Sequence, residues 1–325
     1  MLYNFIMSDI VKLLKDAGLK GRGGAGFPTG DKWQTVLDAK AEQIIIVING
    51  AEGEPGVKKD HFILENYMET VVDGLKIGLE TFENSKGIIY LKNEYFAEFG
   101  DKLRELVKGL PVEIFEKSGG YLCGEETVVV EVINGKRKEP TIKPPYPANK
   151  GILINNVETW YHIAKIAKGE YKNTKFYTIS GEAKNPGVFE MDEKTTIEAA
   201  LKETDNYPKF EFFVQSGGGM AGEILLKDEL GQAPKGQGAI VIYNKEIADG
   251  WELMKTWIDF FYQENCDKCT PCREGVYRVR EMLATKKFDQ KVFSDLCFVL
   301  EQTSFCALGK VAANAIKSYY EKVGL

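Results

Sequence analysis

Apolar strand patterns alternate with amphipathic helix patterns in the first half of the chain. A short apolar run at residues 44–49 predicts a buried strand, and a helical pattern follows over residues 62–81. The order then repeats, with a strand pattern at 87–91, a helix pattern at 94–107 and a strand pattern at 112–115. Strands that alternate with helices predict a mostly parallel sheet with helices on both faces, so we expect an α/β unit here.

The pattern of secondary structure that the sequence predicts changes twice further along the chain. The Pro-rich residues 140–147 predict an extended surface crossing, because proline fixes φ and lacks an N–H. Residues 175–243 show short alternating runs between Gly- and Pro-containing turns, with one short helix at 196–202, which predicts a small β-rich domain of the β-grasp kind. From Trp251 onward the pattern is helical. We therefore expect three domains, at residues 1–170, 171–245 and 246–325.

Charge and hydropathy exclude two classes of partner. The 325 residues include 42 basic and 48 acidic side chains, a formal net charge of −6, which gives no support to nucleic-acid binding. The most apolar run, residues 44–48, is far too short to span a bilayer. The start of the chain predicts an amphipathic helix over residues 9–17 rather than a targeting signal. We expect no nucleic-acid partner and no direct membrane insertion.

Three of the six cysteines fall within seven residues. Cys266, Cys269 and Cys272 form C-x-x-C-x-x-C, and Cys306 lies on a later helical segment. Three thiolates at this spacing can converge from one turn, and a distant fourth completes the all-thiolate ligation of a [4Fe–4S] cluster. Structural zinc also accepts four cysteines, but normally as two separated C-x-x-C pairs. Crowded cysteines without a visible secretion signal indicate a reducing compartment, so we expect a cytoplasmic location.

Cys297 competes with Cys306 for the fourth ligand position. If residues 295–308 formed one helix, their separation of nine residues would place the two thiols on opposite faces, since a turn takes about 3.6 residues. Cys297 has apolar neighbours, so we expect it to be a small buried hydrophobe and Cys306 to be the ligand. Cys123 is distant in sequence and is expected to pack rather than to bind metal.

Residues 21–30 form a Gly-rich loop. Gly21, Gly23 and Gly26 satisfy G-x-G-x-x-G, but the dinucleotide fingerprint needs these glycines between a strand and the helix that the strand feeds. A helix pattern precedes this loop and the nearest strand pattern follows it, which argues against the Rossmann fingerprint. With Arg22 and Lys32 nearby, the loop still offers close backbone approach and positive charge to a nucleotide phosphate. A merely flexible loop is the alternative.

This loop is the first of several motifs that together resemble one family, the NADH-binding flavoprotein (F) subunits of respiratory complex I. It reads G-R-G-G-A-G-F-P-T-G from Gly21 to Gly30, followed by Lys32-Trp33. The further motifs, in the family's order, are Glu52-Gly53-Glu54-Pro55-Gly56, Gly124-Glu125-Glu126-Thr127, Lys143-Pro144-Pro145, Asn155-Asn156-Val157-Glu158-Thr159, Cys266 to Arg273, and Cys306-Ala307-Leu308-Gly309. The resemblance spans almost the whole chain. The same module occurs in NAD-linked hydrogenases, formate dehydrogenases and electron-bifurcating complexes.

The resemblance implies a Rossmann-like FMN domain, a ubiquitin-like β-grasp domain of the soluble-ligand-binding (SLBB) type, and a helical bundle that carries the cluster. It implies an NAD(H)-dependent flavoprotein subunit that exchanges hydride between NADH and FMN and electrons between FMN and a [4Fe–4S] cluster. A thioredoxin-like [2Fe–2S] subunit, together with further iron–sulfur or catalytic subunits, would be its partners.

The site residues that the resemblance implies fall into three sets. The FMN set is Gly21, Arg22, Gly23, Gly24, Lys32, Asn49, Glu52, Tyr121, Gly124, Glu125, Asn155, Asn156 and Thr159. The nicotinamide nucleotide would have Phe27 and Tyr146 near its adenine and polar contacts from Lys32, Glu54, Glu126 and Lys143. The cluster ligands would be Cys266, Cys269, Cys272 and Cys306. The cofactors carry the reaction, so Glu54 and Glu126 would orient the nucleotide, and an acid near a ribose would favour NADH over NADPH.

Two positions depart from the family pattern. Ala51 stands where the family usually has Asp, and Thr35 where an aromatic residue is usual. These departures favour a soluble hydrogenase, formate dehydrogenase or electron-bifurcating assembly over complex I, and they permit a non-catalytic iron–sulfur scaffold as an alternative. A membrane ion-pump subunit related to the Rnf family is a third interpretation. That interpretation would be favoured by a second ferredoxin-like cysteine run, which the sequence lacks.

Overall fold

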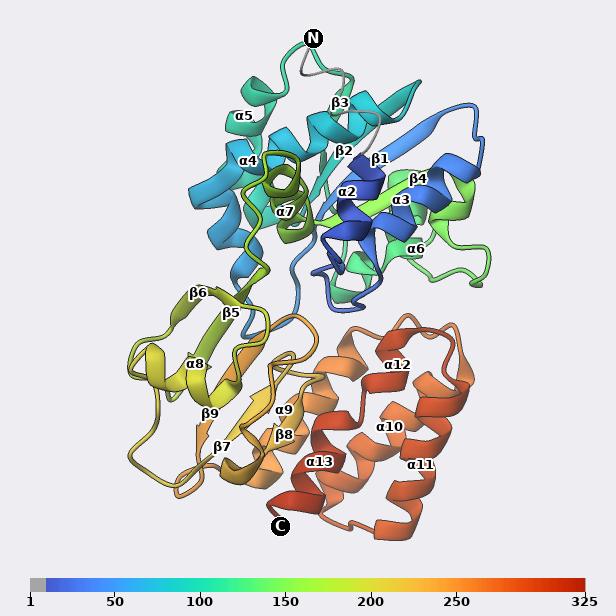
Figure 1. The fold of residues 1–325 in the computed structure, drawn as a ribbon. Helices are drawn as coiled ribbons and strands as arrows, with labels where there is room; N and C mark the ends of the chain where they lie inside the picture. Colours follow the sequence, from blue (N-terminus) through green and yellow to red (C-terminus); the bar gives the residue numbers. More distant parts are fainter. Residues whose placement is uncertain (1–9, 325) are drawn as a thin grey trace.

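The computed structural model describes residues 10–324, which form an α/β part, a second sheet and a helical part (Figure 1). The helices of the α/β part are α2 (Ile10–Asp16), α3 (Thr29–Asp38), α4 (Lys59–Thr81), α5 (Asn93–Leu106), α6 (Glu126–Ile133) and α7 (Val157–Ala167). Its strands are β1 (Ile44–Gly50), β2 (Ser85–Leu91), β3 (Val112–Glu116) and β4 (Ile152–Asn156), with 3-10 turns η1 (Tyr121–Gly124) and η2 (Pro147–Lys150). The four strands are all parallel, in the order β3-β2-β1-β4.

The parallel sheet is buried on both faces, which explains why its strands read as continuous apolar runs. Alternate side chains of a strand point to opposite faces. In β1, Ile46 and Ile48 belong to the core that includes residues of α2, α3, α4, α5 and α7. Val47 belongs instead to the core that includes residues of α6 and of the C-terminal helices. The helices on each face of the sheet therefore pack against the same four strands.

The second sheet contains β5 (Thr174–Gly181), β6 (Gly187–Asp192), β7 (Phe212–Ser216), β8 (Glu223–Leu225) and β9 (Ala239–Asn244) in the order β6-β5-β9-β7-β8. Strands β5 and β9 are parallel, and the remaining pairs are antiparallel. Helix α8 (Ile197–Glu203) shares one apolar core with this sheet. On the other face, Phe213 packs edge-on against Tyr319 of the C-terminal helices.

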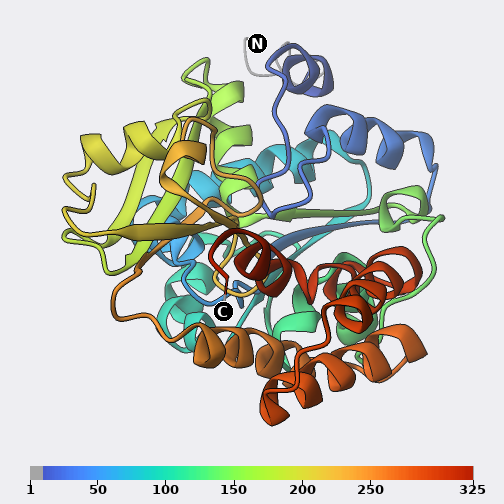
Figure 2. The same ribbon diagram turned by 90° about the horizontal axis from the view of Figure 1, so that it is seen from below.

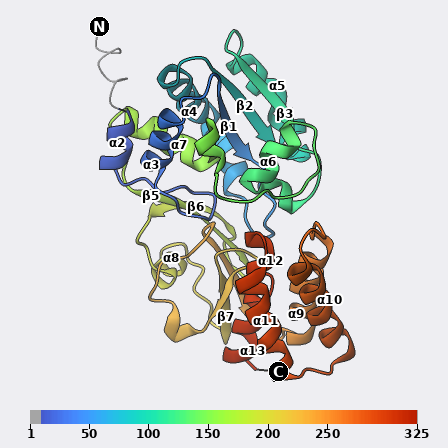
Figure 3. The same cartoon turned by 90° about the vertical axis from the view of Figure 1, so that its right-hand side faces the viewer.

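The helical part contains α9 (Gly250–Gln263), α10 (Thr270–Thr285), α11 (Gln290–Thr303), α12 (Ala307–Val311) and α13 (Asn314–Lys322). Figures 1 and 3 show these helices beside the second sheet, with both lying below the α/β part. The view from below shows the same two neighbours side by side (Figure 2). Within residues 10–324, no helix has the length and apolar character that crossing a membrane requires.

The predicted alternation of strands and helices is confirmed, as is the parallel α/β sheet. The sequence patterns did not reveal α3, α6 or β4. Helix α3 begins at Thr29, inside the segment read as a loop, and Trp33 is one of its buried anchors. Strand β4 was missed because it ends in two asparagines, a residue type that is depleted in strands, and it is identified only by its pairing with β1. The predicted first helix is present as α2, although its expected start at Asp9 lies outside the described residues.

Helices α4 and α7 cross closely because glycine occupies the contact. A Cβ atom added at Gly74 would collide with the backbone carbonyl oxygen of Trp160, and one added at Gly78 would stand 3.2 Å from the Trp160 ring. The fully buried Trp160 ring in turn donates its Nε1–H to the carbonyl oxygen of Val47 at 3.1 Å. This crossing fixes the position of α7, which begins directly after the end of β4.

We expect Gly74→Ala to lower the stability of the protein. The collision with Trp160 should cost about 1–3 kcal/mol, which exceeds the gain of up to about 1 kcal/mol from better helix propensity. The measurement is the urea concentration at the midpoint of unfolding of the α/β part. Gly231→Ala is the matched control, because its Cβ would meet nothing within 4 Å. Equal midpoints for the two variants would contradict the close crossing.

Candidate functional site: a crevice above beta1 and beta4, beside four thiols

The Gly-rich loop is a closed turn rather than a flexible segment. Its base is fastened by hydrogen bonds from Gly21 N to Phe27 O and from Thr29 N to Leu19 O, both 2.8 Å. Gly24 and Gly26 have φ values of 109° and 66°, a region that glycine enters without steric cost. These hydrogen bonds favour a defined turn over a merely flexible loop.

This loop lies against the first turn of α7. The backbone N–H of Arg22 donates to Thr159 Oγ1 at 2.9 Å. A Cβ added at Gly23 would stand 3.3 Å from Asn156 Cβ, so the absence of a side chain lets the loop backbone approach the helix start. Asn156 is the N-cap of α7, and its side chain accepts from Glu158 N at 3.1 Å.

The loop covers the point where the strand order reverses. Strand β1 pairs with β2 on one side and with β4 on the other. The chain leaves β1 towards β2 through α4, so connections diverge between β1 and β4, and a crevice forms outside the carboxyl ends of these two strands. Asn49 lies at the end of β1 on one side of this crevice, and Asn155 and Asn156 end β4 on the other.

Turn η1 and the start of α6 form the third wall. Asn49 Nδ2 donates to Gly124 O at 3.0 Å, and Asn49 Oδ1 accepts from Ala51 N at 3.2 Å. Glu125 is the N-cap of α6 and accepts from Thr127 N at 2.8 Å. Four segments that are far apart in sequence thus meet around one crevice, as the predicted site requires.

A cluster of charged side chains lies at the mouth of the crevice. Lys143 Nζ contacts Glu125 Oε1 at 2.7 Å and Glu126 Oε1 at 3.1 Å. Lys32 Nζ donates to Ile154 O at 3.1 Å and lies 3.9 Å from Glu126 Oε2. Burial lowers the pKa of Lys32. Burial acts in the same direction on Lys143, but hydrogen bonds and charge from the two glutamates outweigh it and raise the pKa of Lys143.

Two aromatic rings extend the site towards solvent. Phe27, at the base of the Gly-rich loop, is 52% exposed, and Tyr146 is 50% exposed. Lys143 Nζ stands 5.9 Å from the centre of the Tyr146 ring. Exposed aromatic faces next to a polar cluster suit a ligand that has a flat base at one end and charge at the other.

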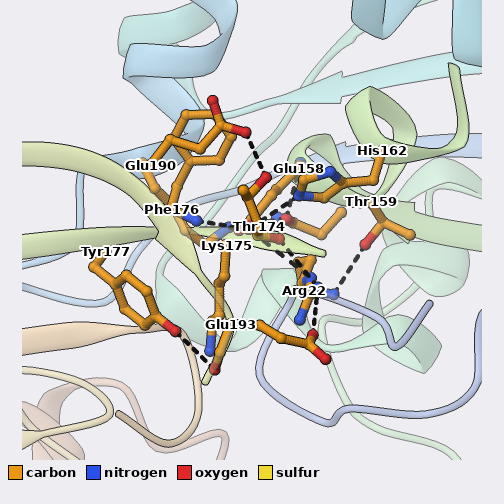
Figure 4. A network of polar contacts seen from close by, with 12 residues as sticks. Arg22, Glu158, Thr159, His162, Thr174, Lys175, Phe176, Tyr177, Glu190 and Glu193 are labelled. Carbon is orange, nitrogen blue, oxygen red and sulfur yellow. Dashed lines mark hydrogen bonds and ion pairs between the residues drawn. The ribbon is translucent and has the colours of Figure 1, made fainter. Parts of the chain in front are cut away.

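Three side chains of the predicted set face the protein instead of the crevice. Figure 4 shows the Arg22 guanidinium among Glu193, Glu158 and Thr174, and its Nη2 reaches Glu193 Oε2 at 2.8 Å. Glu52 accepts from Asp60 N at 3.0 Å, so it caps α4. Glu54 accepts from the backbone N–H groups of the second sheet's loop at residues 220–221.

A cavity of about 650 Å³ opens beyond β1, β2 and β3, with Glu52, Glu54 and Tyr121 in its wall. Its other lining residues include Lys92 and Lys117, and the asparagines at the ends of β1 and β4 are not among them. Glu52, Glu54 and Tyr121 therefore line a space that the residues at the ends of β1 and β4 do not line.

Sequence reasoning missed a buried ion pair beneath the crevice. Lys59 is fully buried, and its Nζ lies 2.6 Å from Asp60 Oδ1, 3.2 Å from Glu158 Oε2 and 2.9 Å from Asn156 Oδ1. Glu158 lies inside the Asn-Asn-Val-Glu-Thr motif, and Lys59 and Asp60 open an apolar helix shortly after the Glu-Gly-Glu-Pro-Gly motif. Charged residues at the starts of apolar helices were the sequence signal that could have indicated this buried ion pair.

The four predicted cysteine ligands are gathered by two helix starts. Cys269 is the N-cap of α10, which places Cys272 in its first turn, and Cys306 is the N-cap of α12. A Cβ added at Gly309 would stand 2.9 Å from Cys272 Cβ. Lys268 Nζ lies 5.0 Å from the centre of the Phe305 ring, so the two cysteine-bearing loops are in contact.

The thiols also affect one another electrostatically. Burial, followed by the charges of Cys269, Cys306 and Cys266, raises the pKa of Cys272 to about 12. Backbone N–H groups of Leu308 and Gly309 point at Cys306 and oppose the rise that burial causes in its pKa. Mutually repelling thiolates that accept backbone hydrogen bonds fit an iron–sulfur cluster, which neutralises their charge.

Within residues 10–324, no group of three or more His, Cys, Asp or Glu side chains is arranged to hold a single metal ion. A [4Fe–4S] cluster takes its four thiolates around a larger body.

Cys297 and Cys306 are not in one helix, so that premise of the sequence argument is wrong. Helix α11 ends at Thr303, and α12 begins at Ala307. Cys297 lies in α11, is buried, and its pKa is raised to about 12 by burial, with Lys317, Glu321 and Glu301 as its charged neighbours. Cys297 therefore has a different environment from the other thiols. Cys123 is buried, as expected.

The backbone and charge of this crevice fit a flavin nucleotide. The side chains absent at Gly23 and Gly26 leave the loop backbone open, since a Cβ at Gly26 would meet nothing within 4 Å. The N-terminus of the 11-residue helix α7 and the ammonium of Lys32 provide positive charge at the end of β4. Together with four clustered thiols, this crevice defines an iron–sulfur flavoprotein.

Family comparisons agree with this class. The model described as Nuo51 FMN-binding domain matches residues 14–165, and the NADH-ubiquinone oxidoreductase-F iron-sulfur binding region matches residues 252–323. The second match decides the cysteine motif in favour of iron–sulfur over zinc. The chain belongs to the family of NADH-quinone oxidoreductase F subunits, which confirms the resemblance seen in its sequence.

Relatives of two kinds match almost the whole chain. The F subunit of NADH-quinone oxidoreductase in Aquifex aeolicus is 31% identical, over 98% of this chain and 85% of the relative. The HndC subunit of the NADP-reducing hydrogenase in Solidesulfovibrio fructosivorans is also 31% identical, over 96% of this chain and 74% of the relative. The NAD+-reducing [NiFe]-hydrogenase in its air-oxidized state matches with a TM-score of 0.90 and 26% identity, covering 97% of this chain and 61% of that chain. The chain thus spans about three-fifths of that solved chain.

We expect Cys306→Ser to lose the cluster and Cys297→Ser to keep it. Cys306 lies with the other three thiols, whereas Cys297 is a packed side chain in α11. The measurement is iron content and the visible absorbance of both variants after anaerobic reconstitution. The two are matched controls for each other, and equal iron content would contradict the ligand assignment.

Proposed function

We propose that this chain is the nucleotide-oxidising flavoprotein subunit of a multi-subunit oxidoreductase, exchanging hydride between NADH and FMN and electrons between FMN and a [4Fe–4S] cluster. One observation carries the proposal. Lys268, which lies between Cys266 and Cys269, donates from Nζ to the carbonyl oxygen of Pro140 at 2.6 Å, and Thr141 N donates to Thr127 Oγ1 in the first turn of α6 at 3.0 Å. The crevice and the thiols are therefore close neighbours, as electron transfer between them requires.

The flavin is proposed to lie between the Gly-rich loop and the ends of β1 and β4. Backbone groups of the loop and the start of α7 would hold its phosphate, with Lys32 as the cation. The proposed flavin residues are Gly21, Arg22, Gly23, Gly24, Lys32, Asn49, Glu52, Tyr121, Gly124, Glu125, Asn155, Asn156 and Thr159. Arg22 and Glu52 would contribute by holding their loops in place, because their side chains have partners inside the protein and the Arg22 N–H donates to Thr159 Oγ1.

The nicotinamide nucleotide is proposed to enter past the exposed aromatic rings. Phe27 and Tyr146 would stack its adenine, and Lys32, Glu126 and Lys143 would hold its polar groups. Glu126 would also repel the additional phosphate of NADPH, which favours NADH. Glu54 would act on the nucleotide through its loop. Bound FMN supplies the hydride chemistry, and the cluster supplies one-electron transfer.

Tyr121 is proposed to join the flavin side of the molecule to the cluster side. Its backbone N–H donates to Glu264 Oε2 at 2.6 Å, two residues before the first cysteine of the motif. Its ring packs edge-on against Phe260 of α9, with centroids 5.1 Å apart. This contact joins turn η1 to helix α9, which precedes the cysteine motif.

We also propose the three-domain division at residues 1–170, 171–245 and 246–325. The boundaries are supported by the end of α7 at Ala167, the start of β5 at Thr174, the end of β9 at Asn244 and the start of α9 at Gly250. The second sheet would be an SLBB β-grasp domain, which is supported by its central parallel pair β5 and β9 and its single packed helix α8.

The relatives are subunits of larger assemblies, and they include both quinone oxidoreductases and hydrogenases. We therefore propose a thioredoxin-like [2Fe–2S] subunit and further iron–sulfur or catalytic subunits as partners. A hydrogenase, formate dehydrogenase or electron-bifurcating assembly in the cytoplasm would suit the reduced thiols. Residue Ala51, where the family usually has Asp, supports this choice over complex I.

The direct test is an anaerobic titration of the reconstituted protein with NADH, observed at the flavin absorbance band. We expect bleaching at close to one NADH per flavin, and a much weaker response to NADPH. Bound flavin that NADPH bleaches and NADH does not would overturn the nucleotide assignment. A chain that retains its cluster but no FMN would instead support the non-catalytic scaffold.

A further inference from the structure

The Gly-rich loop is attached to the second sheet through one buried side chain. Arg22 is only 5% exposed, although it sits in a loop. Its Nη2 contacts Glu193 Oε2 at 2.8 Å, the carbonyl oxygen of Thr174 at 3.2 Å and the hydroxyl of Tyr171 at 3.3 Å. Thr174 begins β5, and Glu193 directly follows β6 (Figure 4).

The guanidinium has no need of a bound anion to balance its charge. Glu193 is in direct contact, and Glu158 Oε1 stands 4.0 Å from Arg22 Nε. A side chain held this way cannot reach a flavin phosphate without breaking its contacts with Glu193, Thr174 and Tyr171. Breaking a part-buried ion pair together with two hydrogen bonds is costly, so this arrangement favours a fixed arginine.

The loop also packs against the start of α7. The backbone N–H of the same residue donates to Thr159 Oγ1 at 2.9 Å, and Gly23 lies against Asn156. The second sheet approaches this loop again at Gly24, whose added Cβ would stand 3.3 Å from Gln237 Cγ. The conformation of the loop is thus determined from both sides.

The loop after β1 is attached to the second sheet as well. Glu54 Oε1 accepts from Met220 N at 2.8 Å and from Ala221 N at 3.2 Å. Pro55 O accepts from Gly219 N at 3.0 Å, and Lys58 N donates to Thr178 Oγ1 at 3.2 Å. The second sheet therefore contacts two of the segments that form the crevice.

We propose that the second sheet acts as a brace for the flavin crevice, and that Arg22 and Glu193 are positioning residues that set the Gly-rich loop. The guanidinium of Arg22 acts on FMN through Glu193 and the loop backbone, without contacting the flavin itself. This inference rests on the proposed flavin site. According to this inference, residues 171–193 support flavin binding by holding the Gly-rich loop, although they lie outside the crevice.

The test compares FMN affinity in Arg22→Gln, Glu193→Gln and the double variant. The full chain is used, with its cluster reconstituted, and affinity is read from quenching of flavin fluorescence. We expect each single variant to weaken FMN binding about tenfold, the effect of losing a hydrogen bond to a charged group. The double variant should be no weaker than the single ones, because both changes remove one interaction.

Glu190→Gln is the matched control. Glu190 lies on β6 close to Glu193 in sequence, but its carboxylate accepts its hydrogen bond from the exposed hydroxyl of Thr174, at 2.5 Å. It should leave FMN affinity unchanged. Tyr171→Phe, a milder change that removes one contact to Arg22 without altering charge, should weaken FMN about two- to threefold and keeps the test available if the charge variants fold poorly.

A second readout separates positioning from direct contact. Amide hydrogen exchange at residues 21–26 of the flavin-free protein should accelerate in Glu193→Gln, because the loop loses its anchor before any cofactor binds. Weakened FMN binding in Arg22→Gln with unchanged binding in Glu193→Gln would overturn the inference. Failure of the wild-type chain to bind FMN would instead overturn the proposed function.

Discussion

One buried carboxylate, that of Glu158, joins the parts of the molecule that form the crevice. It is completely buried and contacts Lys59 Nζ at 3.2 Å, His162 Nε2 at 3.6 Å and the backbone N–H of Phe176 at 3.0 Å. Burial opposes its charge, but Lys59, His162 and Arg22 outweigh that effect and lower the pKa of Glu158 to about 2. A buried charge without these partners would be strongly destabilising, so the segments that supply them are held together. Those segments are the Gly-rich loop, the start of α4, helix α7 and strand β5.

The same buried charges also hold the start of α7 in place beside the Gly-rich loop. Lys59 reaches both Glu158 and Asn156, so the N-cap of α7 is fixed from below while the Gly-rich loop covers it from above. In the proposed site, backbone atoms would face the cofactor, and the buried acids and bases of the motifs hold the segments that carry those atoms. A motif residue can therefore serve the site without touching a ligand.

The sequence predicted a strand or helix correctly where the spacing of its apolar residues and the length of the segment were unambiguous. Strands β1, β2 and β3, helices α4 and α5 and the parallel sheet follow from apolar spacing alone, because both faces of the sheet are covered. Strand β4 and helix α6 were not predicted, because their identity depends on tertiary pairing rather than on a local pattern. The structure brings the motif segments together, but the motifs could not show the direction of Arg22, Glu52 or Glu54. Side-chain direction depends on Glu193, Asp60 and Met220, which are distant partners that spacing does not reveal.

The central claim is that the charge of Glu158 holds these segments in register around the crevice. The most direct measurement is amide hydrogen exchange of the full chain with and without Glu158→Gln, followed at Arg22 and Phe176 and at the helix α10 that bears the cysteines. The account predicts faster exchange at Arg22 and Phe176, no change in α10, and loss of FMN affinity with iron content retained. Unchanged exchange at both positions, together with normal FMN binding, would contradict it.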